Sequence, residues 1–299
     1  MAALTDAASI RGPVLAWYAL ERRDFPWRGT ADPYAVLVSE VMLQQTQASR
    51  VAERYPRFLR RFANAEALAA APPAAVLAEW SGLGYNRRAL ALQGAASIVA
   101  SDGWPRDVAG LQRLPGVGPY TARAIASLAF GTPIGVVDTN VRRWLLRRFG
   151  GPDDASALQS LADALAAPGR GDAVAAWTHA SMELGASVCR SRAPRCDACP
   201  IAVGCPSRGI DRRIAVPRQP GLRGSARAYR GALLRALAEA PGHRLGDRRA
   251  RTLLERAGDR IGPPLDDGAW ERVLAGLERD GLIHRSRGGL ELGAATIAS

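Results

Sequence analysis

The chain has no lysine, so all 40 basic residues among its 299 are arginines. Arginine side chains cannot form a Schiff base, which needs a deprotonatable amine, so mechanisms that use a lysine nucleophile are excluded. Arginine still serves phosphate recognition, because its planar guanidinium binds two oxygens at once. The net charge of +12 therefore suits a polyanionic partner such as DNA or RNA, although a coding bias toward arginine would also raise the charge.

Long apolar runs are missing as well. No segment approaches the roughly 18 apolar residues of a membrane helix, and no charged start precedes an apolar signal core. We therefore expect a cytoplasmic, nucleoid-associated protein without a membrane partner. Apolar residues still make up 47% of the chain, which allows a large core, and the length allows two domains.

Alternating strand patterns are scarce, and helical periodicity dominates the chain. Helices are predicted at Pro33–Phe58, Ala65–Trp80, Arg87–Ala100, Thr121–Phe130, Ala155–Leu165, Tyr229–Ala240, Arg248–Ala257 and Gly268–Asp280. Residues 282–292 read as two strands around a turn at Gly288–Gly289. We expect a mainly α protein.

The domain organisation follows from the proline- and glycine-rich segment 214–225, which we predict to be a linker. It separates a helical domain at 1–213 from a module at 226–299. Three helices and a hairpin favour a winged-helix-like module, and a generic helical tail is the alternative.

The four cysteines lie within one short segment, which in a cytosolic protein favours metal binding over disulfides. Their spacing is C-x6-C-x2-C-x5-C, formed by Cys189, Cys196, Cys199 and Cys205. Four thiolates in such a loop hold either a [4Fe–4S] cluster or a zinc ion, and spacing alone leaves both open.

A glycine-rich turn, Leu114-Pro115-Gly116-Val117-Gly118, separates two helical segments. Gly116 and Gly118 permit a tight turn, and Pro119 is a favoured first residue of the next helix. Backbone amides at such a helix start bind phosphate, so the turn is either a DNA-backbone contact or an ordinary helix connection.

Two acidic residues stand in apolar surroundings. Asp138 follows Val136 and Val137, where an aspartate is most often a helix N-cap. Glu40 shares a helical face with Gln44 and Gln47 on an otherwise apolar helix. This polar stripe lines either a cleft or a solvated surface.

Several strings together resemble the adenine DNA glycosylases of the MutY type, in the helix-hairpin-helix superfamily that includes endonuclease III. They are Pro26-Trp27-Arg28, Ser39-Glu40-Val41-Met42-Leu43-Gln44-Gln45-Thr46-Gln47, Gly82-Leu83-Gly84-Tyr85, the glycine-rich turn, Asp138 and the cysteine spacing. The resemblance covers roughly Leu15 to Cys205. It implies a helix-hairpin-helix DNA glycosylase fold with a [4Fe–4S] loop at 189–205, followed by the small winged-helix-like C-terminal module.

The resemblance also implies roles for single residues. Glu40 corresponds to the general acid that protonates adenine at N7, and Asp138 to the carboxylate that stabilises the cationic sugar. The residues expected to enter the duplex and replace the flipped base are Gln44, Gln45, Thr46, Leu83 and Tyr85. Trp27 and Arg28 correspond to the adenine pocket, and Asn140 to a position beside Asp138. Glu183 lines the pocket or forms a salt bridge in the core.

Tyr120 occupies the position at which endonuclease III places its lysine. Together with the absence of lysine, this favours a monofunctional glycosylase that hydrolyses the N-glycosidic bond without lyase activity. The Tyr120 hydroxyl lies near the sugar or packs as an ordinary aromatic. The expected partner is double-stranded DNA with a mispaired or damaged base, bound by a monomer.

The resemblance departs from its family at the C-terminus. A nucleotide-hydrolase-like domain that checks for 8-oxoguanine is not recognisable here, so the recognition of the opposite base stays open. The preferred substrate is adenine opposite 8-oxoguanine or G. The alternatives are a glycosylase for thymine or another mismatched base, and a non-catalytic iron–sulfur DNA-binding sensor.

Overall fold

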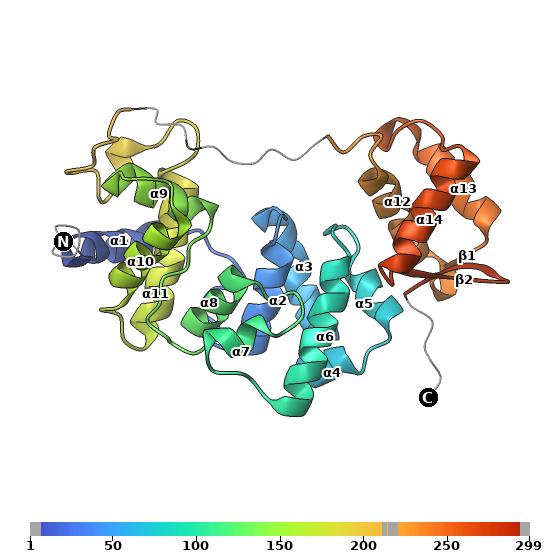
Figure 1. The fold of residues 1–299 in the computed structure, drawn as a ribbon, viewed down its shortest axis with the longest axis horizontal. Coiled ribbons are helices and arrows are strands. Elements are labelled where there is room, and N and C mark those ends of the chain that lie inside the picture. Colours follow the sequence, from blue (N-terminus) through green and yellow to red (C-terminus); the bar gives the residue numbers. More distant parts are fainter. Residues whose placement is uncertain (1–6, 211–213, 215–220, 294–299) are drawn as a thin grey trace. The chain divides into compact units, whose positions relative to one another are not determined.

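The computed structural model describes residues 7–210, 214 and 221–293. Its secondary structure is mainly helical, as predicted, with three short strands near the C-terminus (Figure 1). Half of the predicted linker, 215–220, lies outside the described residues. No helix in the described ranges is both long enough and apolar enough to cross a membrane.

The chain folds into two compact units that do not follow its order. One unit comprises residues 1–40 and 104–217, and the other comprises 41–103 and 218–299. The division into 1–213 and 226–299 stays a prediction.

The first unit contains the start of helix α2 and six other α-helices of the described residues. They are α1 (Ala7–Glu21), α2 (Pro33–Leu43, which continues into the second unit), α7 (Val108–Gln112), α8 (Pro119–Leu128), α9 (Thr139–Phe149), α10 (Ala155–Ala166) and α11 (Asp172–Glu183). A π-helical turn at Leu184–Val188 and a 3-10 turn at Cys196–Ala198 follow. Its core lies between α1, α9, α10 and α11, where Trp144 and Trp177 meet edge to face at 6.5 Å.

The second unit contains two groups of elements. The earlier one has α3 (Ala48–Arg61), α4 (Ala65–Ala69), α5 (Pro73–Trp80) and α6 (Arg87–Asp102). The later one has α12 (Ala226–Glu239), β1 (Arg244–Leu245), α13 (Asp247–Ala257), α14 (Asp267–Arg279), β2 (Ile283–Ser286) and β3 (Gly289–Leu292), with 3-10 turns at Pro241–His243 and Gly258–Arg260.

The three strands form an antiparallel sheet in the order β1-β3-β2. Buried Leu233, Leu237, Trp270 and Leu277 from α12 and α14 form the core beneath it. The order helix, strand, helix, helix, hairpin agrees with the winged-helix-like module that the sequence predicts. Strand β1 was not predicted, because two residues carry no alternation pattern.

Two predicted helices are wrong as single elements. Pro33–Phe58 is interrupted after Leu43, and Gln45 has a left-handed φ of 57° in the connecting segment. Ala65–Trp80 is interrupted at Ala70–Pro72, because Pro73 begins a new helix at a position that a proline favours. The hairpin turn also lies one residue earlier than predicted, since Gly289 is already in β3.

Candidate active site

Glu40 and Tyr120 meet inside the first unit. Glu40 comes from α2, its residue is only 5% exposed, and its Oε2 has no hydrogen-bond partner. Burial raises the pKa of Glu40 to about 7, a hydrogen bond with the Tyr120 side chain lowers it, and the charge of Asp138 raises it. Burial also raises the pKa of Tyr120 well above 10. Glu40 is therefore a carboxyl group that holds a proton near neutral pH.

Asp138 is the N-cap of α9. Its Oδ1 accepts hydrogen bonds from the backbone N–H of Asn140 at 2.9 Å and of Val141 at 2.7 Å. Its Oδ2 accepts one from the Asn140 side-chain amide at 2.7 Å. Burial raises the pKa of Asp138, and the hydrogen bonds from Val141 and Asn140 act in the opposite direction. Asp138 is thus the predicted N-cap and lies close enough for its charge to act on Glu40, while its catalytic role stays a prediction.

The segment before Asp138 is fixed by a polar network. The Gly135 N–H donates to Asp163 Oδ1 at 2.8 Å, and the Gly135 carbonyl accepts from Arg123 Nε at 2.8 Å. Gly135 also packs so closely on Ala162 that a Cβ at this position would overlap it. The chain therefore enters α9 along a fixed path, and this path sets the position of Asp138.

Asn140 links Asp138 to the cysteine segment. Its Oδ1 accepts from Arg143 Nη2 at 2.8 Å, and Arg143 Nε donates to the Cys189 carbonyl at 2.7 Å. Gly185 lies against the Asn140 backbone, where a Cβ would come within 2.5 Å of the Asn140 carbonyl oxygen. A continuous row of hydrogen bonds thus runs from Asp138 to Cys189.

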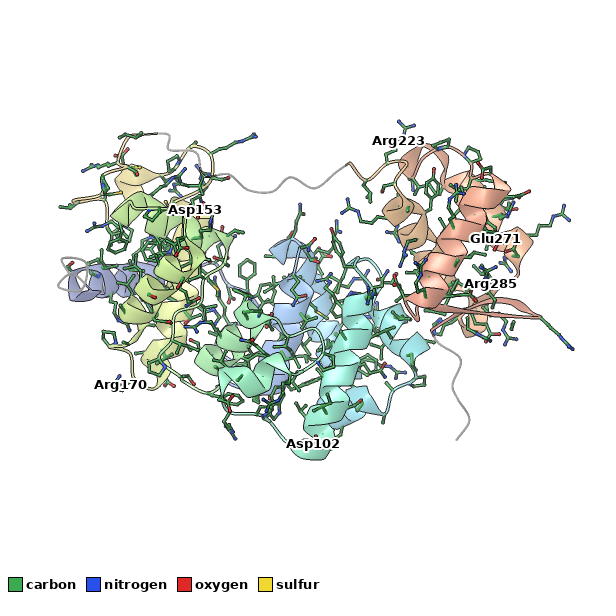
Figure 2. All side chains as sticks on the ribbon, viewed as in Figure 1. Asp102, Asp153, Arg170, Arg223, Glu271 and Arg285 are labelled. Carbon is green, nitrogen blue, oxygen red and sulfur yellow. The ribbon has the colours of Figure 1, made fainter. Side chains whose placement is uncertain are left out.

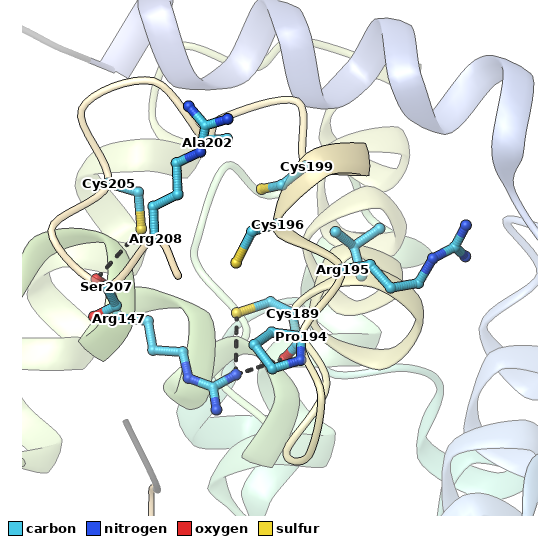
Figure 3. A pocket seen from close by; sticks show the side chains of 11 residues that line it. Arg147, Cys189, Pro194, Arg195, Cys196, Cys199, Ala202, Cys205, Ser207 and Arg208 are labelled. Carbon is cyan, nitrogen blue, oxygen red and sulfur yellow. Dashed lines mark hydrogen bonds between the residues drawn. The ribbon is translucent and has the colours of Figure 1, made fainter. Parts of the chain in front are cut away.

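The four cysteines line one cavity (Figure 3). All four are free thiols, and arginines 147, 195 and 208 line the same cavity. Arg147 Nη1 donates to Cys189 Sγ at 3.6 Å, and Cys205 Sγ donates to the Arg147 carbonyl at 3.6 Å. Burial raises the pKa of Cys199 to about 11 and also raises that of Cys189. In the described part of the chain, no three His, Cys, Asp or Glu side chains stand close enough to hold one metal ion.

This cavity fits a group that is bound by several thiolates. Four sulfur donors face one space, and the surrounding guanidinium groups supply positive charge that offsets the negative charge of ionised thiols. Pro194 lies in the same lining, where it restricts the backbone between Cys189 and Cys196.

The glycine-rich turn connects α7 to α8 as predicted. Gly116 has a left-handed φ of 76°, and exposed Gly118 is the N-cap of α8. Leu114 and Val117 are buried, and the Val117 N–H donates to the Leu114 carbonyl at 3.1 Å. The exposed glycines therefore face outward at the start of a helix.

The remaining predicted residues of the first unit form a charged cluster. Glu183 is buried and paired with Arg28, and its Oε1 accepts from Arg23 Nε at 2.6 Å. Trp27 is buried and stacks on Phe25 with ring centroids 4.7 Å apart. Glu183 is thus engaged in a salt bridge, as one of its two interpretations expected, and its contact with a base stays a prediction.

Two loops of the second unit carry the residues predicted to enter DNA. Gln45 and Tyr85 have left-handed φ values of 57° and 48°, which side-chain-bearing residues rarely adopt. The Thr46 hydroxyl donates to the Leu83 carbonyl at 3.2 Å, which joins the two loops. The loop conformations are therefore held by contacts between them rather than by local preference.

Arg88, on α6, holds both loops. Its Nη1 donates to the carbonyls of Val41 at 2.7 Å, Met42 at 3.1 Å and Gln44 at 2.5 Å, and its Nη2 donates to Thr46 Oγ1 at 3.0 Å and to the carbonyls of Leu83 at 3.3 Å and Gly84 at 2.9 Å. Burial lowers the pKa of Arg88 to about 10, so it stays cationic at neutral pH. Its place in the sequence, three residues after Tyr85 of the Gly82-Leu83-Gly84-Tyr85 string, was the signal that could have identified it.

Comparisons with known proteins agree with this arrangement. Residues 38–167 match the family described as HhH-GPD superfamily base excision DNA repair protein. The chain is 40% identical over 287 residues to the adenine DNA glycosylase of Mycolicibacterium smegmatis, a match that covers 92% of this chain and 93% of that protein. The chain belongs to the adenine DNA glycosylase family. This confirms the MutY-type resemblance and the helix-hairpin-helix superfamily.

Two further relatives show how far the likeness extends. The human adenine DNA glycosylase is 44% identical over 224 residues, which is 69% of this chain and 40% of that protein. A solved thermostable thymine-DNA glycosylase superposes with a TM-score of 0.64 at 32% identity, and covers 70% of this chain and 99% of that one. The bacterial adenine glycosylase thus matches a larger share of this chain than either of these proteins does.

Proposed function

We propose that the protein is a monofunctional DNA glycosylase that releases adenine mispaired with 8-oxoguanine or G in double-stranded DNA. The observation that carries the proposal is the buried pair of unlike carboxyl groups, Glu40 and Asp138, in a chain of the adenine DNA glycosylase family. Endonuclease-type lyase chemistry is not part of the proposal, because the chain has no lysine.

Glu40 acts as the general acid. A carboxyl group with a pKa of about 7 is about half protonated at neutral pH, so a substantial fraction of the protein carries the proton that Glu40 must give up. Its Oε2 is buried without a partner, and adenine N7 is the acceptor that would take its proton. Protonation makes the base a neutral leaving group, so the C1′–N9 bond breaks with its electron pair staying on adenine.

Asp138 acts on the sugar. Loss of the base leaves an oxocarbenium-like sugar, and an ionised carboxylate next to it lowers the energy of that state. The hydrogen bonds from Asn140 and Val141 favour the ionised form of Asp138. A water molecule then adds its hydroxyl to C1′ and gives its proton to Asp138, which leaves an abasic site with an intact backbone.

The cysteine segment holds a [4Fe–4S] cluster in this proposal, with Cys189, Cys196, Cys199 and Cys205 as ligands. When bound, the cluster fixes the loop through four thiolate bonds. Arg147 and Arg143 stabilise the same loop by donating hydrogen bonds to Cys189. Purified protein should then contain iron and acid-labile sulfide in equal amounts, and zinc in their place would contradict the cluster.

Single-turnover base release tests the function. Duplexes with A opposite 8-oxoguanine, A opposite G, and T opposite G are compared for wild-type protein and Glu40→Gln. We expect adenine release by the wild type alone, with strand cleavage only after alkali. Thymine release would instead support the mismatch glycosylase, for which the 32% identity to a thymine-DNA glycosylase is the favouring observation. Tight binding without release of any base would support the non-catalytic sensor.

The same preparation tests the expected monomer. Gel filtration with light scattering should give the mass of one chain, 31.7 kDa, both alone and on a short duplex. A mass of two chains would contradict the proposed monomer.

A further inference from the structure

The late group of elements in the second unit packs on the early group. Helix α12 and strand β3 both contact α5. A Cβ at Gly293 would lie 3.1 Å from the Ala74 nitrogen, and a Cβ at Gly281 would lie 3.7 Å from Leu90 Cδ1. Arg87 of α6 pairs with Asp280 at 3.7 Å. We call the residues 221–293 the C-terminal module, and these contacts place it against α5 and α6.

One hydrogen bond joins the C-terminal module to a loop that is predicted to enter DNA. Arg227 Nη1 donates to the Tyr85 hydroxyl at 2.7 Å, and the Arg227 guanidinium lies 5.7 Å from the Tyr85 ring centroid. The Arg88 guanidinium lies 5.6 Å from the same centroid. Tyr85 is thus held by two cations, one from each group of elements.

Local helix stability does not explain an arginine at this place. Arg227 is the second residue of α12, whose N-cap Ser225 accepts from the Ala228 N–H at 3.3 Å. A cation in the first turn of a helix is unfavourable, because the helix dipole is positive at that end. The contact with Tyr85 contributes to offsetting this cost.

The Tyr85 loop is also surrounded by positive charge. Arg50 Nη1 donates to the Gly82 carbonyl at 3.4 Å, and a Cβ at Gly82 would lie 3.3 Å from Arg54 Nη2. Arginines on this surface attract the phosphates of a duplex, whatever its sequence. A tyrosine at their centre is placed to meet base pairs once the backbone is bound, and fixing its rotamer in advance lowers the entropy lost on insertion.

We propose that Arg227 is a positioning residue through which the C-terminal module sets Tyr85 for insertion next to the mispair. The module thereby contributes to the distinction between A opposite 8-oxoguanine and A in a normal pair. The proposal rests on the proposed function for the identity of the mispair. It assigns to the C-terminal module a part in recognising the base opposite adenine, a question that the sequence leaves open.

A double-mutant cycle tests this coupling. The variants are Arg227→Ala, Tyr85→Phe and their combination, with Arg227→Lys as the conservative variant. Arg235→Ala is the matched control, because Arg235 is an exposed arginine on the same helix. The dissociation constant is measured for duplexes with a stable abasic analogue opposite 8-oxoguanine and for fully paired duplexes, and thermal melting checks the fold.

We expect Arg227→Ala and Tyr85→Phe each to weaken mispair binding about fivefold, the value of one hydrogen bond of about 1 kcal/mol. The combination should be no weaker than either single variant, and Arg227→Lys should recover part of the loss. Arg227→Ala should affect paired duplexes no more than Arg235→Ala does, since both remove one charge. If Arg227→Ala does not fold, Tyr85→Phe removes the same hydrogen bond from the other side and must show the same loss.

Two outcomes would overturn the proposal. One is additive losses in the combination, and the other is an equal loss for Arg227→Ala and Arg235→Ala on every duplex. Failure of the proposed function is seen separately, as an absence of adenine release by the wild type. The double-mutant cycle measures dissociation constants and does not depend on base release. The coupling between Arg227 and Tyr85 can therefore be measured whether or not the wild type releases adenine.

Discussion

The acid site of the first unit and the DNA-entry loops of the second unit are stabilised in opposite ways. Glu40 gains its property by burial, with one carboxyl oxygen left without a partner. The loops at Gln44–Thr46 and Leu83–Tyr85 are instead held by five hydrogen bonds from one guanidinium group, that of Arg88. A buried carboxyl oxygen without a hydrogen-bond partner can transfer a proton, whereas loop carbonyls that each accept a hydrogen bond keep the backbone in one conformation.

The largest effect is expected at Glu40. Glu40→Gln keeps the size of the side chain and removes the transferable proton, so the single-turnover rate of adenine release should fall roughly 10²- to 10⁴-fold. Duplex binding should stay near the wild-type value. Glu53→Gln, at an exposed glutamate on α3, is the control and should leave the rate unchanged. An active Glu40→Gln variant would remove Glu40 from the mechanism.

Asp138→Asn separates charge from helix capping. Asparagine caps helices as well as aspartate does, so the melting temperature should change little, while the rate falls about 10²- to 10³-fold through loss of the negative charge. Asp154→Asn changes the N-cap of α10, which accepts from the Ala157 N–H at 2.7 Å, and should not change the rate. If the lower rate of Asp138→Asn were explained by a lower melting temperature, the residue would act only as a helix cap.

The pH dependence tests the protonation of Glu40. The pKa of about 7 means that the active, protonated form predominates below this pH, and that the rate falls about tenfold per unit above it. The hydrogen bond with Tyr120 lowers the pKa of Glu40, so Tyr120→Phe should move this falling limb to higher pH. Single-turnover rates across the neutral range measure the shift. A limb that stays in place, or moves to lower pH, would contradict the contact.

Arg88→Ala tests how the DNA-entry loops of the second unit are held in shape. It leaves carbonyls of both loops without their donor, which should lower the free energy of unfolding by about 1–3 kcal/mol. Affinity for mispaired DNA should fall with it, because both loops lose their fixed shape. Arg60→Ala removes an exposed arginine from α3 and serves as the charge-matched control. Urea denaturation and duplex titration give the two quantities. Unchanged stability would show that the loops hold their shape without Arg88.

The smallest effect is expected at Arg285, which shows the contrast with Arg88. Arg285 of β2 contacts Glu271 at 2.7 Å and Glu278 at 2.9 Å near the protein surface (Figure 2). Pairs at this level of exposure contribute about 0–1 kcal/mol, because water and salt screen them. Arg285→Ala should thus change the urea midpoint far less than Arg88→Ala does. A loss as large as that of Arg88 would mean that exposed pairs carry much of this module's stability.

The sequence predicts the residues of the acid site better than the shape of the loops. Spacing and local strings identify Asp138, Glu40 and the four cysteines, and the structure brings the first two together and the cysteines around one cavity. Helix periodicity, however, continues through Gln44 to Gln47 without a stop signal. At the interruption, the Gln44 carbonyl accepts a hydrogen bond from Arg88, which is more than forty residues away along the chain.

Other features were missed for the same physical reason. Arg143 and Arg227 look like any other arginine in a chain that has 40 basic residues, and only the folded chain places them against Asn140 and Tyr85. The break at Pro72–Pro73 differs, because two adjacent prolines are a local signal that the periodic pattern obscured. Contacts between residues far apart in the sequence could not be predicted from local patterns, whereas the helix break at the proline pair could have been predicted.

The discontinuous second unit has a consequence for the order of folding. Its early part, 41–103, leaves the ribosome long before its partner segment 218–299. The surface of α5 and α6 that later receives α12 and β3 therefore stays uncovered while more than a hundred residues of the other unit are synthesised. Closing so long a loop is slow relative to local helix formation, so assembly of the second unit is expected to be the last step in the maturation of this chain.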